Sequence, residues 1–290
     1  MPAGHPLRQL RIAAVFLSLL VAAAPRVEAQ ARATADTGRV RVVSIPGSLP
    51  APRNAVVVLP VGYETSERRY PVLYLLHGHD GGHRNWVDRT NLLAYTARLD
   101  LIVVLPDGGN SWYTNSVSRP EERFEPYVGV EVPAFIDQNF RTLTYREARY
   151  VAGLSMGGFG ALKLGLTYPG RFSLAGSFSG STRAVTDTVS PTVRDAFGPP
   201  GNTARAENDL LAMAGRAPVA GTPYLYVDCG SADRLLASNR AFVEVLGARG
   251  LAYEYHEVSG GHGWEYWDRR LPVFLRLVEE RIAALPAAGG

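Results

Sequence analysis

Hydrophobic residues follow two spacings along the chain from about residue 38 onward. Short runs rich in β-branched residues predict strands, whereas apolar positions three or four residues apart predict helices. The succession of the two is typical of a mostly parallel sheet covered by helices. The expected strands are residues 39–45, 55–59, 72–76, 102–106, 149–154, 174–179, 224–229 and 253–258.

The helical spacing predicts longer helices over residues 127–140, 156–168 and 235–246 and within residues 264–285. Pro272 is expected to kink or divide the last of these. The first two strands are joined through Pro46, Gly47 and Pro50 without a helix, which favours an antiparallel start. We therefore expect an α/β fold whose eight-stranded sheet is mostly parallel, with helices on both faces and no large separate lid domain.

Two connections in this pattern are longer than the few residues typical of α/β units. One spans residues 107–126, and the other spans residues 180–221 and holds a helical patch near residues 204–214. Loops that follow the carboxyl ends of strands build the sites of open α/β sheets. These two segments are therefore the expected walls of a binding site.

The first 29 residues have the pattern of a signal peptide. Arg8 and Arg11 precede an apolar run over residues 12–24, and Val27 and Ala29 are suited to a cleavage site. The run falls short of the roughly 20 residues that cross a bilayer. We expect a secreted protein, periplasmic or extracellular, without a stable membrane anchor after cleavage. Residues 30–37 are expected to be flexible, and residues 38–286 to form one domain.

The charge and the cysteine content bear on nucleic-acid binding and on disulfide formation. The formal charge is +3. The signal segment carries three arginines and one glutamate, a net +2, so about +1 remains, and the arginines are scattered. This distribution is unlike the basic stripe of a nucleic-acid-binding protein. The single cysteine, Cys229, excludes an intrachain disulfide and is expected to be a buried, inert thiol.

The segment GLSMG at residues 153–157 follows an apolar strand and opens a helical stretch. It matches the Gly-x-Ser-x-Gly pattern of a nucleophilic serine on a sharp strand-to-helix turn. Glycine is required two residues on either side of Ser155 because a Cβ there would collide with the neighbouring strand or helix. We predict Ser155 as a nucleophile. The alternative is a glycine-rich strand-to-helix turn in which the serine has no catalytic role.

A nucleophilic serine needs a histidine to take its proton and a carboxylate to orient that histidine. On such a sheet these partners follow the serine in the order acid, then histidine. His262, in a glycine-rich turn, is the predicted base, because His256 falls within an alternating strand run. Asp233, just past a strand, is the predicted acid, with Asp228 as the alternative. Asp233 could also be only a helix N-terminal charge.

Acyl transfer also needs two backbone amides that bind the oxyanion. One is expected from Met156, which follows the nucleophile, and the other from the loop after the third strand, HGHDGG at residues 77–82. Within that loop the amide of His79 is the predicted donor, with Gly78 beside it in the substrate pocket. The histidines of the loop lack a regular ligand spacing, so neither a metal nor another cofactor is predicted.

The four tryptophans, Trp86, Trp112, Trp264 and Trp267, fall in or next to the predicted site loops. Aromatic rings there offer apolar area for a sugar, an aromatic acid or an acyl chain. Trp112 and its neighbour Asn110 are predicted to line the substrate pocket. Trp264 and Trp267 are expected to bury the C-terminal helix instead.

Five segments together resemble the esterase family related to esterase D, in the α/β-hydrolase superfamily. They are YPVLYLLHG (70–78), NSWYTN (110–115), GLSMGG (153–158), CGSAD (229–233) and GGHGWEYW (260–267). The family includes tributyrin esterases, S-formylglutathione hydrolases, feruloyl esterases and mycolyltransferases. The resemblance implies a Ser155, Asp233, His262 triad and an oxyanion amide from the residue after His77 and Gly78.

The resemblance and the residues predict a secreted serine carboxylic-ester hydrolase that works through an acyl-enzyme. Small acyl, acetyl or feruloyl esters, with or without a carbohydrate, are the expected substrates. The predicted signal peptide and the HGH sequence at residues 77–79 argue against S-formylglutathione hydrolysis. An acyltransferase that passes the acyl group to a sugar or other alcohol is the alternative, followed by a non-catalytic carbohydrate-binding protein. The pattern does not indicate an oligomeric state.

Overall fold

The computed structural model describes Met1 and residues 38–286. Apart from Met1, the expected signal peptide, residues 1–29, and the segment 30–37 lie outside the described residues. Eight strands form one sheet: β1 (Val40–Ile45), β2 (Arg53–Val58), β3 (Val72–Leu76), β4 (Ile102–Pro106), β5 (Arg149–Leu154), β6 (Leu174–Phe178), β7 (Tyr224–Gly230) and β8 (Tyr253–Val258). Every predicted strand is present, within two residues at each end.

The strands lie in the order β1-β2-β4-β3-β5-β6-β7-β8. Strand β2 pairs antiparallel with β1 and with β4, and all the other pairs are parallel. The predicted antiparallel start and mostly parallel sheet are therefore confirmed. Because β3 and β5 to β8 run the same way, their carboxyl ends meet at one edge of the sheet.

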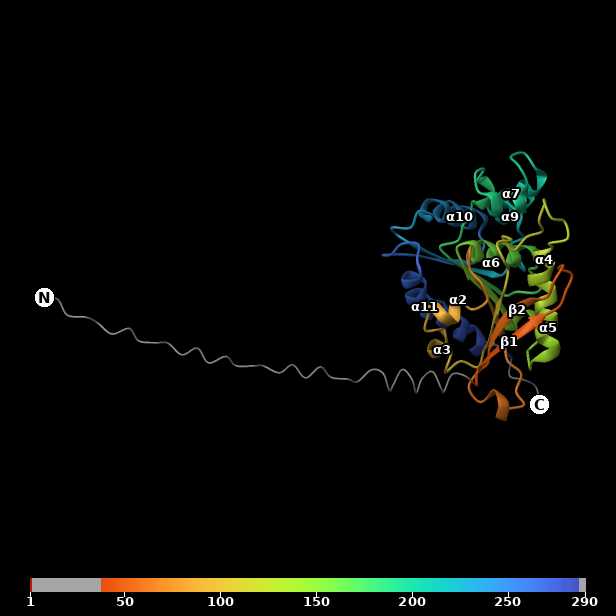
Figure 1. The fold of residues 1–290 in the computed structure, drawn as a ribbon, viewed down its shortest axis with the longest axis vertical. Helices are drawn as coiled ribbons and strands as arrows, with labels where there is room; N and C mark the ends of the chain where they lie inside the picture. The colour runs from red at the N-terminus through yellow and green to blue at the C-terminus, as the bar shows by residue number, and fades with distance from the viewer. Residues whose placement is uncertain (2–37, 287–290) are drawn as a thin grey trace. The chain divides into compact units, whose positions relative to one another are not determined.

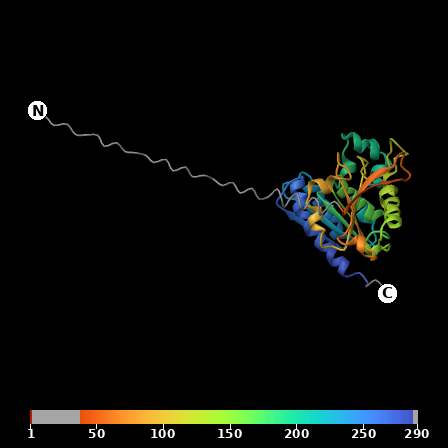
Figure 2. The same ribbon diagram turned by 60° about the horizontal axis from the view of Figure 1, so that its bottom comes forward.

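Helices cover both faces of the sheet (Figures 1 and 2). They are α2 (Asn85–Arg89), α3 (Leu92–Tyr95), α4 (Phe124–Pro126), α5 (Val132–Asn139), α6 (Met156–Thr167), α7 (Pro191–Phe197), α8 (Thr203–Glu207), α9 (Leu210–Arg216), α10 (Leu236–Arg249) and α11 (Trp264–Ala283). Short helical turns are η1 (Tyr63–Thr65), η2 (Tyr127–Glu131), η3 (Arg146–Ala148) and η4 (Ala184–Thr186). Among the described residues, no helix combines the length and hydropathy that a membrane span requires.

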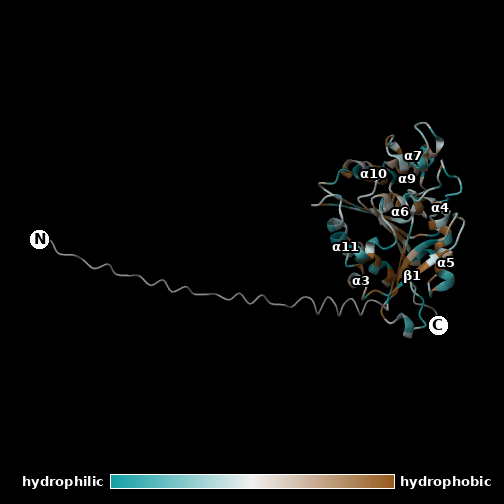
Figure 3. Cartoon of the chain, in the orientation of Figure 1, coloured by the Kyte–Doolittle hydropathy of each residue, from teal (hydrophilic) through white to brown (hydrophobic). Residues whose placement is uncertain are grey.

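Two hydrophobic clusters hold these layers together. Val72, Tyr74 and Leu76 of β3 pack with α5, α6, α9 and α10, whereas the alternate residues Leu73 and Leu75 pack with α2, α3 and α11. All five are fully buried, because a strand covered on both faces needs apolar side chains at every position. Figure 3 shows the hydrophobic strands inside and hydrophilic segments on the outer helices.

The helices agree with the predicted ones in part. The predicted helix over residues 127–140 is present as a continuous helical run through η2 and α5, in which η2 is a π-helical segment. Helix α11 continues through Pro272, so this residue does not divide the helix. The connection over residues 180–221 holds η4, α7, α8 and α9 rather than one helical patch. It lies above the carboxyl edge of the sheet, at the top of Figure 1.

Strand β3 and helix α6 approach each other closely at Gly157. A Cβ at this residue would lie 2.5 Å from the carbonyl oxygen of His77 and 2.6 Å from that of Leu76. Backbone atoms cannot yield as a flexible side chain would. The glycine pattern predicted from the sequence therefore has a direct structural cause.

We expect the substitution Gly157→Ala to lower the free energy of unfolding by about 1–3 kcal/mol, because α6 must move away from β3. Gly215→Ala is the matched control, since Gly215 lies in α9 with open space around its Cβ position. There the alanine should leave the stability unchanged or raise it by about 1 kcal/mol. Urea unfolding measures both. Equal stability of Gly157→Ala and the wild type would contradict the close approach.

Candidate active site

Ser155 occupies the turn between β5 and α6 in a conformation that is rare for a side-chain-bearing residue. Its φ is 52° and its ψ is −115°. Such backbone strain persists only where the surroundings impose it. The Ser155 N–H donates to the Phe178 carbonyl at 2.9 Å, and the Ser155 carbonyl accepts from the N–H groups of Phe159 and Ser181, each at 3.1 Å. These bonds fix the serine backbone at the sheet edge.

A continuous chain of hydrogen bonds joins Ser155 to His262 and Asp233. The Ser155 Oγ lies 2.9 Å from His262 Nε2, and His262 Nδ1 lies 2.9 Å from Asp233 Oδ2. An ionised carboxylate can only accept, so Nδ1 carries the proton and Nε2 is free to accept from the serine hydroxyl. The structure thus brings together three residues that are up to 107 positions apart.

Asp233 is held in place by more than the histidine. Its side chain is buried, and its Oδ1 accepts the Leu235 N–H at 2.8 Å. Burial raises the pKa of this carboxyl, but the hydrogen bonds from His262 and Leu235 outweigh it, and the pKa lies below the ordinary value. Asp233 is therefore ionised at neutral pH, as an orienting carboxylate must be.

The alternative residues Asp228 and His256 pair with each other in register on β7 and β8, and neither takes part in the hydrogen-bonded chain to Ser155. Asp228 is fully buried and accepts hydrogen bonds from the hydroxyls of Tyr226 and Tyr266 and from Arg270. Tyr266 and Arg270 belong to α11, so Asp228 ties β7 to the helix that follows His262. The contacts assign it a structural role.

Two tryptophans lie behind His262 rather than in a substrate pocket. The ring of Trp267 packs edge-on against the His262 imidazole, with centroids 5.0 Å apart, and Trp264 packs against Trp267 and Trp86. Trp267 belongs to the hydrophobic cluster that packs with α2, α3 and α11, and Trp264 packs against that cluster. This is the packing role expected from the sequence.

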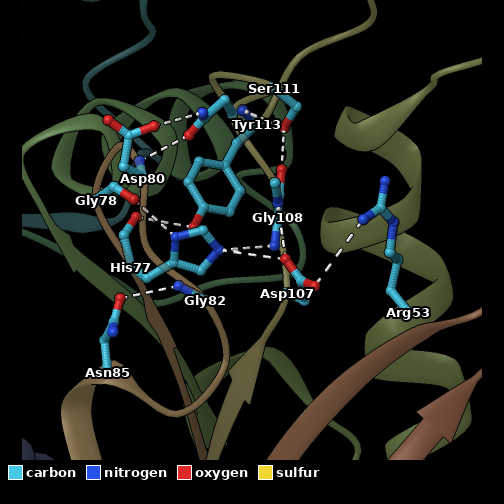
Figure 4. A network of polar contacts seen from close by, with 12 residues as sticks. Arg53, His77, Gly78, Asp80, Gly82, Asn85, Asp107, Gly108, Ser111 and Tyr113 are labelled. Carbon is cyan, nitrogen blue, oxygen red and sulfur yellow. Dashed lines mark hydrogen bonds and ion pairs between the residues drawn. The ribbon is translucent and has the colours of Figure 1, made fainter.

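The loop after β3 is held by the buried ring of His77 (Figure 4). Its Nε2 accepts the Gly108 N–H at 2.9 Å, so Nδ1 carries the proton and donates to the Gly78 carbonyl at 2.8 Å. The Tyr113 hydroxyl donates to the His77 carbonyl at 2.9 Å. The loop over residues 77–80 is thereby anchored to the loop that follows β4.

Asn110 contributes to the same anchorage and is not among the residues that line the cavity beside Ser155. Its side-chain oxygen accepts the Asp80 N–H, and its amide donates to the Asp80 carboxylate, both at 2.8 Å. Gly78 is also absent from the lining, although a Cβ there would lie 3.5 Å from the Ser155 Cβ and 2.6 Å from the Leu154 side chain. Gly78 thus lets the loop approach the nucleophile.

Of the two predicted oxyanion residues, Met156 directly follows Ser155 and His79 lines the same cavity. Met156 is the first residue of α6, where the N–H has no partner within the helix. His79 lines the cavity with Ser155, and its ring contacts Asp80 through Nδ1 at 3.1 Å and Thr192 through Nε2 at 3.1 Å. The ring of His79 is thus engaged by neighbouring side chains.

A cavity of about 410 Å³ opens beside Ser155. Trp112, predicted for the pocket, is one of its walls, and its indole N–H donates to Thr192 at 3.2 Å. The full lining is His79, Trp112, Ser155, Ser181, Arg183, Ala184, Thr186, Asp187, Ser190, Arg234, Leu235 and Ser238. Most of these come from the connection over residues 180–221 or from the start of α10, and sequence reasoning assigned none of those individually.

Cys229 lies inside β7 and is fully buried. Burial raises the pKa of its thiol to about 12, with the negative charges of Asp233 and Asp228 adding to the effect. A thiol in this state is a poor nucleophile at neutral pH. The expectation of a buried, inert cysteine is confirmed.

Comparison with known proteins places these features in a family. The family described as "Putative esterase" matches residues 47–277. An esterase of Mycobacterium tuberculosis is 36% identical over 238 residues, which are 71% of this chain and 51% of that protein. The chain therefore spans about half the length of this relative.

Two further proteins match over more of their own length. An acetyl esterase of Caldicellulosiruptor saccharolyticus is 30% identical over 212 residues, covering 68% of this chain and 79% of the relative. The solved structure of a ferulic acid esterase has a TM-score of 0.73 and 27% identity, over 84% of this chain and 99% of the other. With its mostly parallel eight-stranded sheet and its serine turn between β5 and α6, the chain belongs to this esterase family of the α/β-hydrolase fold.

Proposed function

We propose that this esterase hydrolyses carboxylic esters through an acyl-enzyme on Ser155, with His262 as general base and acid and Asp233 as the orienting carboxylate. The observation that carries the proposal is the hydrogen-bonded chain from Ser155 Oγ through His262 to Asp233 at the wall of an open cavity. No metal or other cofactor is required for this chemistry.

The first half of the reaction acylates the serine. Ser155 Oγ attacks the acyl carbon while its proton passes to His262 Nε2, and the carbonyl oxygen becomes an oxyanion. The imidazolium that forms is stabilised by the ionised Asp233. His262 then gives the proton to the leaving alkoxide, and the alcohol departs.

The second half regenerates the enzyme. Water attacks the acyl carbon and gives one proton to His262, the carboxylic acid leaves, and the proton returns to Ser155 Oγ. An alcohol in place of water would yield a new ester, so acyl transfer is the alternative that product analysis with an added alcohol distinguishes.

The backbone N–H groups of Met156 and His79 are the proposed oxyanion donors. The N-terminus of α6 places the Met156 N–H and the positive end of the helix dipole next to Ser155. The loop that carries His79 is held in position by the hydrogen bonds of His77, Tyr113 and Asn110. Preorganised donors of this kind are worth about 3–4 kcal/mol each in the transition state.

The proposed substrates are esters of small acyl, acetyl or feruloyl groups, with or without a carbohydrate alcohol. A cavity of about 410 Å³ fits a group of this size, and the Trp112 wall offers apolar area. The names of two relatives, an acetyl esterase and a ferulic acid esterase, support this range. A hydrolysis screen over acyl chain lengths, methyl ferulate and acetylated sugars would identify the acyl group.

The substitution Ser155→Ala should lower kcat for para-nitrophenyl acetate by about three or more decades, because the nucleophile is lost. Ser181→Ala is the matched control, since this serine lines the same cavity and bonds to Ser155 through its backbone N–H, which alanine keeps. Steady-state kinetics of both variants provides the test. Wild-type turnover by Ser155→Ala would contradict the assignment of Ser155 as the nucleophile.

Asp233→Asn should lower kcat by about three to four decades while the free energy of unfolding changes by less than about 1 kcal/mol, because the asparagine keeps an oxygen for the Leu235 N–H. Asp228→Asn should show the opposite pattern. It weakens the buried bond to Arg270 and lowers the stability by about 1–3 kcal/mol, with kcat per folded molecule retained. Equal loss of kcat in both variants would contradict the assignment of the acid.

We also propose that the chain is exported, on the strength of the sequence pattern over residues 1–29. Expression of the full chain in a bacterial host should yield a periplasmic or extracellular protein that begins near Gln30. N-terminal sequencing of the purified protein measures this. A protein that keeps residues 1–29 and stays in the cytoplasm would refute export.

A further inference from the structure

Two arginines line the cavity beside the proposed nucleophile. Arg183 lies two residues after Ser181, whose N–H donates to the Ser155 carbonyl at 3.1 Å. Arg234 directly follows Asp233, the partner of His262. Both backbones are therefore tied to the proposed catalytic residues, and both side chains reach the cavity that holds Ser155.

Neither guanidinium is used by the fold. In the chain from residue 38 to residue 286, no hydrogen bond or ion pair joins the side chain of Arg183 or Arg234 to another residue. Both side chains are exposed at the cavity. Arg205, in contrast, is buried and donates to the carbonyls of Val185 and Gly198. Arg205 supports the cavity wall, whereas Arg183 and Arg234 keep all their donors for a ligand.

The carboxylates near the cavity are already engaged by other donors. Asp187 accepts the N–H groups of Val189 and Ser190 at 2.7 and 3.0 Å, and these bonds lower its pKa. Asp233 is buried and bound by His262 and Leu235. Neither carboxylate forms an ion pair with Arg183 or Arg234.

We propose that Arg183 and Arg234 bind a carboxylate carried by the ester substrate, which makes acidic esters the preferred substrates. The inference rests on the proposed function. A guanidinium presents planar N–H donors that match the two oxygens of a carboxylate. The charged groups of the lining are these two arginines and Asp187, a net charge of +1. This balance suits a monoanion better than a phosphate dianion.

The carboxylate can belong to either half of the ester. On the acyl half the substrate is a half-ester of a dicarboxylic acid, and on the alcohol half it is an acyl ester of a hydroxy acid or acidic sugar. Two pairs of substrates with matched shapes separate these sources. Mono-para-nitrophenyl glutarate and the para-nitrophenyl ester of glutaramic acid differ in charge on the acyl half. Meta-acetoxybenzoate and meta-acetoxybenzamide differ in charge on the alcohol half.

The measurement is the ratio of kcat/KM for the charged ester to kcat/KM for its neutral amide partner. Loss of folded enzyme cancels in this ratio, because one preparation hydrolyses both esters. The wild type should prefer the carboxylate by about tenfold in one pair at low salt, and the preference should fall toward unity at about 1 M salt. The pair that shows the preference identifies the half of the ester.

The variants Arg183→Gln and Arg234→Gln should each lower that ratio by about two- to fivefold, the range typical of exposed charge pairs, and the double variant should abolish the preference. Arg98→Gln is the control, since Arg98 is exposed, lies just before β4 at the opposite edge of the sheet, and does not line the cavity. It should keep the wild-type ratio.

The outcomes separate this inference from the proposed function. Hydrolysis of the neutral esters without a preference for either carboxylate would overturn the arginine site and leave the esterase assignment standing. A preference that survives in the double variant would overturn the site as well. Failure to hydrolyse any of the four esters would count against the proposed function and the inference together.

Discussion

The close approach of α6 to β3 at Gly157 is the constraint on which the site depends. Only a residue without a Cβ lets the helix begin directly over the carbonyls of Leu76 and His77. The N-terminus of α6 thus lies at the end of β5, where Ser155 has a positive φ. The loop after β3 is brought to the same point, so the nucleophile and both proposed oxyanion donors converge there.

Because the strands are parallel, residues that follow different strands along the chain lie close together at one edge of the sheet. Ser155 follows β5, Asp233 follows β7 and His262 follows β8, and all three strands end at the same edge. Contacts elsewhere in the structure hold these loops in position. Asp228 ties β7 to α11, and Trp267 packs behind the His262 ring. Rigid elements thus hold the loops that carry the proposed catalytic residues, and the connection over residues 180–221 supplies much of the cavity wall.

The sequence predicted the fold and the positions of the three site residues because each leaves a local signal. Strands buried on both faces read as apolar runs, and the serine turn needs its glycines for a steric reason. The cavity wall left no such signal. Arg183 and Arg234 are brought to the cavity by the Ser181–Ser155 backbone bond and by the bond between Asp233 and His262, contacts that exist only in the folded chain. Asn110, predicted for the pocket, instead binds Asp80, because its long loop folds back over the loop after β3.

The central claim is that Ser155 is the nucleophile, and trapping it with a fluorophosphonate tests this most directly. A serine activated by a histidine displaces fluoride and retains the phosphonyl group, whereas an ordinary serine does not react. Mass spectrometry of the treated protein should show one added phosphonyl group, located on Ser155 by peptide fragmentation. An unmodified protein, or a label on Ser181 or another serine, would contradict the account.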